Sequence, residues 1–298
     1  MAPHPLHCKF RPDTPGLIIW GTWSPTGLQA VGGVQILCDT RLRQIRQHNG
    51  GVELALSDGT QLEARLLVAA DSRFSETRRL LGIGSQMKDF GKSMMVCRMN
   101  HEVDHQQVAW EWFGYGQTLA LLPLNGRQSS VVITLPPREI EKLHEMDPLA
   151  FAREMEARFS HRLGSMELAS GRHVYPLVGA YARRIVAHRS ALIGDAAVGM
   201  HPVTAHGFNF GLSSVQRLSG LLKEAHQQHR DIGAHALLAR YERQQRMATW
   251  PLYQATNLLV ECYTNDRLPM RLLRGAALRA AQQLIPLKRG IARHLTAG

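Results

Sequence analysis

The chain has 298 residues, of which 44% are hydrophobic and 20% charged, which is ample for one or two packed domains. The formal net charge of +11 would suit a nucleic acid or an anionic membrane, but no zinc-finger spacing or RNP-like run accompanies it, so we expect no nucleic-acid partner. The four cysteines form no CxxC pair and no stretch approaches the roughly 18 apolar residues of a membrane-spanning helix, which favours a reduced, cytoplasmic setting.

The first part of the chain changes from an unpatterned segment to strands. Residues 1–33 hold five of the fourteen prolines and show neither helical nor alternating periodicity, so they are predicted to be an irregular leader. Regular secondary structure is expected from Val34 onward. Apolar and polar residues alternate over 52–56, and the turns HNGG and SDGT flank this run, which predicts a three-stranded meander. The last strand ends in LLVAA at 66–70, apolar on both faces as in a central parallel strand.

The rest of the chain passes from strands to helices. Residues 85–180 contain strand-like runs separated by Gly, Asn and Pro, with one helix-like stretch at about 148–163, which indicates a mostly antiparallel layer. Apolar residues then recur at spacings of three and four from about 208 to 225, as is typical of a helix. Helices are expected to continue to the C-terminus, with breaks near Pro251, Pro269 and Pro286.

The first candidate site follows the LLVAA strand. Asp71 comes directly after it, and Ser75 and Arg78 follow at offsets of four and seven. Ligands of open α/β sheets gather at the carboxyl ends of strands, where an acid can accept hydrogen bonds from ligand hydroxyls. Asp71 could instead cap a helix that starts near Ser72 or Ser75. The residues alone leave both interpretations open.

The second candidate site is the segment ALIGDAAVGMHPVTAHGFNFG, residues 191–211. A short strand, ALI, is followed by Gly194 and Asp195, and a Gly-rich loop then leads into the helix expected from about Phe208. The free amides at a helix N-terminus attract negative charge. The layout therefore offers a carboxylate for sugar-like hydroxyls and a helix end for an anion, unless Asp195 only caps a strand–loop–helix connection.

Together, the two motifs resemble those of the FAD-dependent aromatic hydroxylases, most closely the branch that serves ubiquinone biosynthesis. The residues that match are Asp71, Ser75 and Arg78 in the first motif and Gly194, Asp195, Ala196, Ala197, Pro202, Gly207, Asn209 and Gly211 in the second. The resemblance implies FAD as cofactor, NAD(P)H as co-substrate, and O2-dependent hydroxylation of an aromatic ring of a ubiquinone precursor. It also implies that Asp195 holds the ribityl chain and that the helix after it faces the pyrimidine edge of the flavin. The implied cofactor-binding residues are Asp71, Arg78, Gly194, Asp195, Pro202, His206, Gly207, Phe208 and Asn209. No catalytic base is identified.

The resemblance also implies a domain organisation. We expect a mixed α/β (α+β) fold, with a partial Rossmann-like FAD-binding domain formed by residues 34–84 and 186–250. Residues 85–185 would form a β-rich, antiparallel substrate-binding domain, and residues 251–298 C-terminal helices.

The sequence departs from the family pattern in several places. Ser72 replaces the Gly of an Asp-Gly pair, Val198 replaces a His, and Ser214 stands where an Asp usually follows. Ala205 and His206 replace a Gly-Gln pair, although His206 could still donate a hydrogen bond to the flavin edge instead of being a loop histidine without cofactor contact.

The family's G-x-G-x-x-G loop, which cradles the FAD pyrophosphate, does not occur in the sequence. We therefore expect a fragment that lacks roughly the first quarter of a family member and binds FAD poorly. The apolar strands LLVAA and ALI would then have an open sheet edge and lower the solubility.

Other interpretations follow from three further features. HEVDH, at 101–105, matches the H-E-x-x-H pattern of zinc hydrolases, but its flanks are strand-like, which favours a solvated turn between strands. The tail beyond Asp266 is basic and could form an interfacial amphipathic helix on a membrane or pack on the body of the protein. The missing pyrophosphate loop leaves an inactive fragment, or a substrate-binding module without FAD, as the alternative function.

Overall fold

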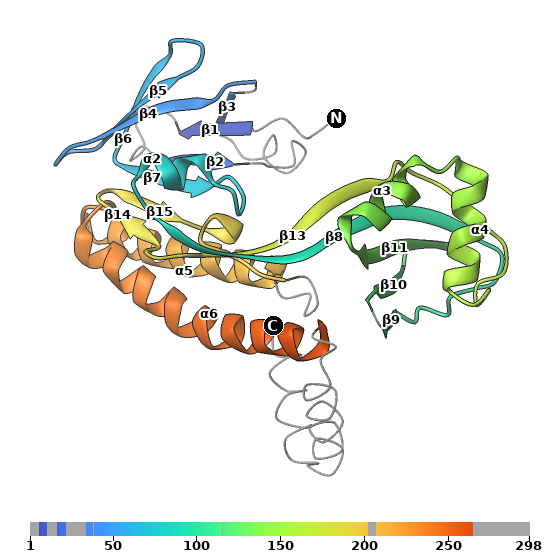
Figure 1. Ribbon diagram of the computed structural model, residues 1–298. Helices are drawn as coiled ribbons and strands as arrows, with labels where there is room; N and C mark the ends of the chain where they lie inside the picture. The colour runs from blue at the N-terminus through green and yellow to red at the C-terminus, as the bar shows by residue number, and fades with distance from the viewer. Residues whose placement is uncertain are drawn as a thin grey trace. The chain divides into compact units, whose positions relative to one another are not determined.

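The computed structural model describes residues 6–10, 17–21, 34–37, 39–114, 116–201 and 207–264. The chain divides into a first unit, Met1–Lys88 with Val178–Leu258, and a second unit, Asp89–Leu177 with Leu259–Ala297. Two strands, β8 (Ser85–His101) and β13 (His173–Ala182), each contain a boundary between the units (Figure 1). The mixed α/β fold expected from the sequence is confirmed, while the functional role of each unit stays a prediction.

The first unit is built on a six-stranded sheet in the order β14-β15-β7-β2-β1-β3. The strands are β1 (Leu6–Phe10), β2 (Leu17–Gly21), β3 (Val34–Leu37), β7 (Leu66–Ala70), β14 (Val186–Ala187) and β15 (Ser190–Leu192). β7 pairs in parallel with β15 on one side and with β2 on the other, so the LLVAA segment is a central parallel strand as predicted.

Two predictions about the start of the chain are wrong. Residues 1–33 are not wholly irregular, because they contribute β1 and β2 to the sheet. The prolines of this segment bound these short runs and do not interrupt them, and the parallel edge of β7 supplies the long-range partner of β2. For the same reason β7 has no open edge.

The expected meander forms a second, three-stranded antiparallel sheet of β4 (Leu42–Gln47), β5 (Val52–Leu56) and β6 (Gln61–Ala64). The apolar residues of β5 alternate toward a small core that also contains Leu42, Leu62 and Leu67. Residue 65 separates β6 from β7, so the chain leaves this sheet and enters the six-stranded one within a single residue.

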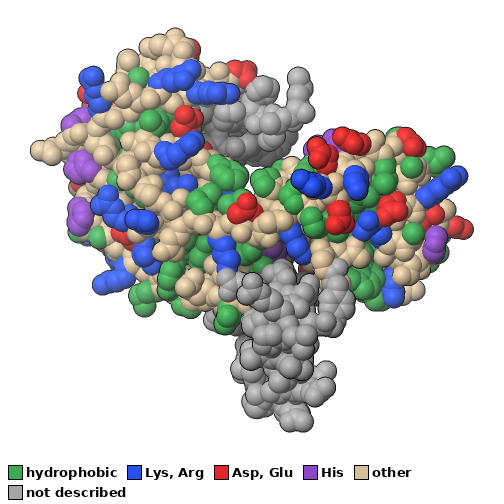
Figure 2. Space-filling model, in the orientation of Figure 1, with side chains coloured by type: hydrophobic (Ala, Val, Ile, Leu, Met, Phe, Trp, Pro, Cys, Tyr) green, Lys and Arg blue, Asp and Glu red, His purple; other side chains and the backbone are tan. Residues whose placement is uncertain are grey.

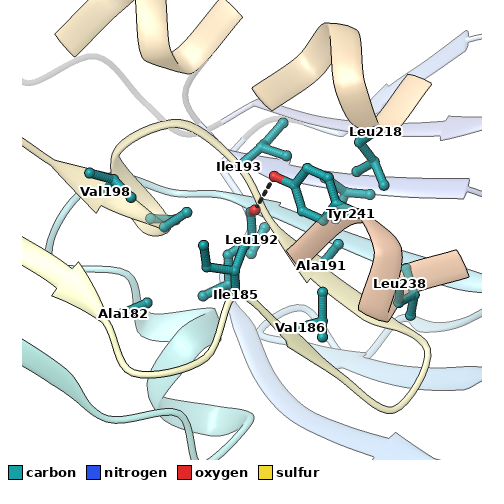
Figure 3. Close-up of a cluster of buried hydrophobic side chains, with 14 of the residues drawn as sticks. Ala182, Ile185, Val186, Ala191, Leu192, Ile193, Val198, Leu218, Leu238 and Tyr241 are labelled. Carbon is teal, nitrogen blue, oxygen red and sulfur yellow. Dashed lines mark hydrogen bonds between the residues drawn. The ribbon is translucent and has the colours of Figure 1, made fainter. Parts of the chain in front are cut away.

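Among the described residues, the first unit contains the helices α2 (Glu76–Leu80), α5 (Gly207–Gln227) and most of α6 (His235–Thr264). α5 confirms the helix expected from about 208 to 225. Figure 3 shows how Leu218 of α5 and Leu238 and Tyr241 of α6 pack on the apolar residues around β15. The Tyr241 hydroxyl donates a hydrogen bond of 2.8 Å to the Leu192 carbonyl, which fixes the end of β15.

The break expected at Pro251 is wrong, because α6 runs through it. A proline inside a helix removes one bond, here to the carbonyl of Met247, and Pro251 and Met247 are both exposed, so water can solvate that carbonyl. The expected breaks at Pro269 and Pro286 lie outside the described residues. In the part of the chain that is described, no helix is both long and apolar enough to cross a bilayer.

An ion pair ties the β14–β15 hairpin to the loop between α5 and α6. Arg189 donates two hydrogen bonds to Asp231, at 2.7 and 3.1 Å, and a third to the Asn49 carbonyl at 2.6 Å. The hydrogen bonds from Arg189 hold the pKa of the Asp231 carboxyl below its usual range. Arg189 is in the left-handed region, with φ of 48°, at the tip of the hairpin.

This ion pair should make the stability of the protein fall at acid pH. The pKa of Asp231 is lower in the folded state than in the unfolded state, where it is about 3.9, so its contribution is present above about pH 4 and lost as the pH falls through the folded pKa. The Asp231 side chain is 37% exposed, so we expect no more than about 1 kcal/mol. Urea unfolding between pH 3 and pH 6 should show a shallower pH dependence for Asp231→Asn than for the native chain. The same pH dependence in both proteins would show that the ion pair of Asp231 does not contribute to the loss of stability at acid pH.

In the second unit, antiparallel strands pair in the order β8-β11-β10-β9, as part of a seven-stranded sheet in which β13 and β12 also pair with β8. The remaining elements of this unit are β9 (Trp110–Phe113), β10 (Thr118–Pro123), β11 (Gln128–Leu135), β12 (Met166–Leu168), α3 (Pro137–Glu145) and α4 (Pro148–Arg158). The antiparallel layer is confirmed. α4 accounts for the helix expected from 148, whereas α3 was not expected. Both helices cover one face of the sheet (Figure 1), where Ile140 and Phe151 join the core with Met95 and Ile133.

Candidate functional site

Asp71 caps the helix that follows it. One carboxylate oxygen accepts a hydrogen bond from the Ser75 hydroxyl, and the other accepts one of 2.9 Å from the Thr77 amide. Ser75 is the N-cap of α2 and accepts a hydrogen bond from the Arg78 amide at 2.9 Å. The structure therefore shows the capping role that the sequence left open, and the cofactor role of Asp71 stays a prediction.

The residue after Asp71 has a strained backbone. Ser72 has φ of 74°, in the left-handed region that favours glycine. This conformation explains why a glycine at this position would suit the turn better than the serine found here. The turn itself is closed by a hydrogen bond of 3.0 Å from the Ser75 amide to the Ser72 carbonyl.

Replacing this serine should stabilise the protein. A non-glycine residue in the left-handed region costs about 1–2 kcal/mol, and part of this is recovered with glycine after the greater flexibility of the unfolded chain is subtracted. We expect Ser72→Gly to raise the free energy of unfolding by about 1 kcal/mol in urea denaturation. Ser72→Ala, which keeps a Cβ, is the matched control and should give no gain. An equal effect of both variants would show that φ is not the cause.

The second motif turns sharply after β15. Gly194 has φ of 57° and begins the short 3-10 turn η1 (Gly194–Ala196), which leads to β16 (Val198–Gly199). Ser214 of α5 holds this turn: its hydroxyl accepts a hydrogen bond of 3.0 Å from the Gly194 amide and donates one of 2.6 Å to the Gly211 carbonyl. A Cβ at Gly211 would stand 3.7 Å from the Gly194 Cα, so the helix and the turn are in close contact.

An arginine that the sequence analysis did not single out joins the two motifs. Arg73 donates to Asp195 Oδ2 from Nη2 at 2.7 Å and from Nε at 3.2 Å, and to the Val178 carbonyl from Nη1 at 2.9 Å. A Cβ at Gly199 would stand 2.8 Å from the Arg73 Cβ, so only glycine lets the 71–75 loop approach β16 this closely. Arg73, in the loop that follows Asp71, therefore holds the carboxylate of Asp195 in place.

Arg78 forms a second connection between the motifs. It is 3% exposed, and its guanidinium donates to the carbonyls of Arg73 and Ala196 at 3.1 Å. Burial lowers the pKa of this guanidinium, an effect that the nearby Asp71 charge opposes. Arg78 Nε is buried and has no hydrogen-bond partner in the part of the chain that the structure describes. The contacts of Arg78 are thus structural, and its cofactor role stays a prediction.

The remaining predicted residues lie at the start of α5 or before it. Gly207 begins the helix, Phe208 is 74% exposed, and Asn209 is exposed. Pro202 and His206 lie outside the described residues. The first amides of a helix have no intrahelical acceptor, so residues 207–209 offer donors to a ligand at this end.

The geometry of the site is compatible with a ribityl chain near Asp195 and with the pyrimidine edge of a flavin near the start of α5. Asp195 Oδ2 is bonded to Arg73, whereas Oδ1 accepts no hydrogen bond from the residues that are described, and the side chain is 31% exposed. A carboxylate oxygen in this state can accept hydrogen bonds from the hydroxyls of a ribityl chain. A Cβ at Gly194 or at Gly207 would meet no atom of the described residues within 4 Å, so no described side chain covers the backbone of either glycine.

The HEVDH segment is not arranged as a zinc site. His101 ends β8, and the residues after it form a turn, so the two histidines do not share a helical face. The turn is not fully solvated, because both rings are buried. The His101 ring bonds to the Val103 carbonyl at 2.8 Å and to the Ser129 hydroxyl at 3.0 Å. The His105 ring bonds to the Leu124 carbonyl at 3.0 Å, and its other nitrogen accepts from a backbone amide. Each of the four ring nitrogens therefore has a hydrogen-bond partner within the protein and is not available to bind zinc. The zinc-hydrolase alternative is wrong.

Two solved structures share the fold of this chain. The structure of Klebsiella pneumoniae HpxO complexed with FAD and uric acid matches with a TM-score of 0.66 and 19% identity, covering 87% of this chain and 67% of that one. The structure of Pseudomonas aeruginosa PqsL, described as a probable FAD-dependent monooxygenase, matches with a TM-score of 0.62 and 17% identity, covering 88% and 80% of the two chains. At such low identity these matches establish the fold alone, which this chain shares with both proteins.

Sequence comparison identifies the family. A model described as an FAD binding domain matches residues 26–256, and the chain belongs to this family. It is 48% identical over 263 residues to a ubiquinone hydroxylase, UbiM, of Neisseria meningitidis, and 37% identical over 269 residues to UbiL of Rhodospirillum rubrum. The matches cover 88% and 90% of this chain but 57% and 63% of those relatives. The resemblance inferred from the motifs is confirmed, and FAD is the cofactor of the family.

Proposed function

We propose that this chain belongs to an FAD-dependent monooxygenase that hydroxylates an aromatic ring of a ubiquinone precursor, with NAD(P)H and O2 as co-substrates. The main support is that Arg73 and Arg78 bring the two aspartate motifs together within the first unit. The names of the relatives, which are ubiquinone hydroxylases, support the substrate class.

The proposed roles follow from the free polar groups of the site. Asp195 Oδ1 would accept hydrogen bonds from the ribityl hydroxyls, and the amides of residues 207–209 would face the part of the flavin that gains negative charge. Pro202 and His206 would complete the loop between them. When bound, FAD supplies the redox chemistry, and the chain binds it, orients it and excludes water. We assign no catalytic base.

Flavin content and turnover test this proposal. The purified chain should bind added FAD, with the absorbance of protein-bound flavin after gel filtration, and oxidise NAD(P)H faster when an aromatic quinone precursor is present. Weak binding is expected without a G-x-G-x-x-G loop, so FAD should be titrated to large excess. Absence of flavin binding at every concentration would contradict the proposal for this chain.

A substrate-binding module without FAD is the second candidate. It is favoured by the engagement of three of the four carboxylate oxygens of Asp71 and Asp195 with groups of the chain itself. This candidate predicts binding of the quinone precursor without flavin absorbance. The flavin titration therefore separates the two functions.

We further propose a cytoplasmic location with peripheral attachment to the inner face of the membrane, where a lipid-like quinone precursor and other proteins of the ubiquinone pathway would be reached. The tail beyond Asp266, which lies outside the described residues, carries the basic side chains that would contact anionic lipid. These side chains are Arg267, Arg271, Arg274, Arg279, Lys288, Arg289 and Arg293.

Removal of the residues after Asp266 should weaken binding to anionic vesicles. Each basic residue near an anionic surface contributes on the order of 1 kcal/mol, so the loss should be large. Co-sedimentation with vesicles that contain phosphatidylglycerol should recover the full chain and leave the shortened chain in solution, with neutral vesicles as the control. Equal recovery of both chains would exclude this role of the tail.

A further inference from the structure

The second unit contains a hollow that shares no residue with the two aspartate motifs. It has a volume of about 280 Å³ and is lined by the β9–β10 edge and by the end of α4 with the turn after it. Leu119 and Phe159 form its apolar side and belong to the core under α3 and α4, so the hollow lies on the helix-covered face of the sheet. Its size is close to the lower limit of small-molecule sites, which is about 300 Å³.

A stack of aromatic rings that carries an arginine lies beside the hollow, and Trp112 of this stack is one of the lining residues. Trp110 and Trp112 are two residues apart in β9, so both rings project from the same face and stack at 5.9 Å with an angle of 17° between them. The guanidinium carbon of Arg162 lies 3.7 Å from the centre of the Trp110 ring. Trp112 in turn meets Phe159 edge to face at 5.6 Å. The negative face of the Trp110 ring attracts the guanidinium and favours its position beside the stack.

The positive charge of Arg162 is not balanced within the hollow. Arg158, the other arginine there, donates to Glu154 at 2.7 Å and to the Gln117 side chain at 2.7 Å. Arg162, by contrast, is exposed to solvent and has no side-chain acceptor or carboxylate partner among the described residues, so its five N–H donors are open to a ligand from solution. Figure 2 shows acidic and basic side chains mixed over the visible face of the second unit.

We propose that this hollow binds a small organic monoanion, namely a carboxylate on a flat apolar body. The planar N–H pair of Arg162 matches the two oxygens of a carboxylate. The apolar body would lie against Trp112, Leu119 and Phe159, which are the hydrophobic groups next to the arginine. An aromatic carboxylate the size of benzoate satisfies both halves of this description, and the site is separate from the flavin function proposed above.

The experiment titrates benzoate into the full chain and follows tryptophan fluorescence. Because Trp110 and Trp112 line the arginine, binding should give a saturable change, with a dissociation constant on the order of millimolar for a ligand this small. Arg162→Ala and Arg162→Lys should both weaken binding roughly tenfold or more, since lysine keeps the charge but loses the planar pair of donors. Arg138→Ala removes an exposed arginine of α3 and should leave binding unchanged.

Two further measurements make the result decisive. Benzyl alcohol, which has the same ring without the charge, should bind at least tenfold more weakly than benzoate, and the signal should be lost in Trp112→Phe but kept in a variant of Trp250, which lies in the first unit. Thermal unfolding checks that each variant is folded. If Arg162→Ala does not fold, Arg162→Lys alone tests the role of the guanidinium. Lack of a saturable change, unaltered affinity in both Arg162 variants, or equal binding of benzyl alcohol would each overturn the proposal.

Discussion

Replacing Asp195 by alanine should weaken FAD binding by roughly ten- to a hundredfold, because a charge-assisted hydrogen bond contributes about 1.5–3 kcal/mol. The reason lies in Oδ1 of Asp195, which accepts no hydrogen bond from the described residues, while Arg73 holds the carboxylate in place through its bonds to Oδ2. Quenching of flavin fluorescence during titration measures the affinity. The ratio between variant and native chain is the relevant quantity, because the absolute affinity is expected to be low.

Asp71 provides the matched control for this prediction. Asp71→Ala removes the carboxylate that accepts from the Thr77 amide in the first turn of α2 and leaves the N-cap Ser75 in place, which should cost about 1 kcal/mol of stability but change flavin affinity less than Asp195→Ala does. Arg73→Ala should fall between the two, because it leaves the carboxylate of Asp195 present but without its partner. Unchanged affinity in Asp195→Ala, or an equal loss in Asp71→Ala, would contradict the role given to Asp195.

The second large effect is expected at Tyr241, which is fully buried where α6 meets β15. Tyr241→Ala should lower the free energy of unfolding by about 3–5 kcal/mol, because it leaves a cavity in the core. Tyr241→Phe keeps the ring but leaves the Leu192 carbonyl without its donor (Figure 3), which should cost about 1–3 kcal/mol. Unfolding of the first unit in guanidinium measures the change in the free energy of unfolding for both variants.

Tyr175 offers the comparison, since its side chain is exposed. Tyr175→Phe should change the stability by less than about 0.5 kcal/mol. If Tyr241→Phe were as mild as Tyr175→Phe, the hydrogen bond to Leu192 would have no measurable effect. Because Leu192 is two residues before Gly194, we also expect flavin affinity to fall in Tyr241→Phe, through displacement of the turn that carries Asp195.

The parts of the fold that could be predicted from the sequence are those with local causes. The alternation in 52–56, the apolar LLVAA run and the spacing of apolar residues in α5 each reflect which side of one element is buried. The glycine before Asp195 likewise marks a bend that its own φ requires. These signals are contained within a few residues, so no knowledge of the tertiary structure was needed.

The parts that could not be predicted depend on partners far along the chain. β2 becomes a strand because β7 offers a parallel edge, and nothing near residues 17–21 indicates that edge. The pairing of Arg73 with Asp195 joins two segments that are distant in sequence, and an arginine in a loop gives no sign of its partner. Ser214 could have been found more easily, since it stands where the family has an Asp and lies one helical turn after Gly211.

The closeness of Gly199 to Arg73 has a consequence for how this protein can diverge. The atom that a side chain at 199 would meet is the Cβ of residue 73, which every amino acid except glycine possesses. The arginine can therefore be exchanged for many other residues without making room at 199, whereas any enlargement of 199 requires the backbone to separate first. In a lineage that loses the bond to Asp195, position 73 is free to drift, while position 199 stays glycine as long as the 71–75 loop lies against β16.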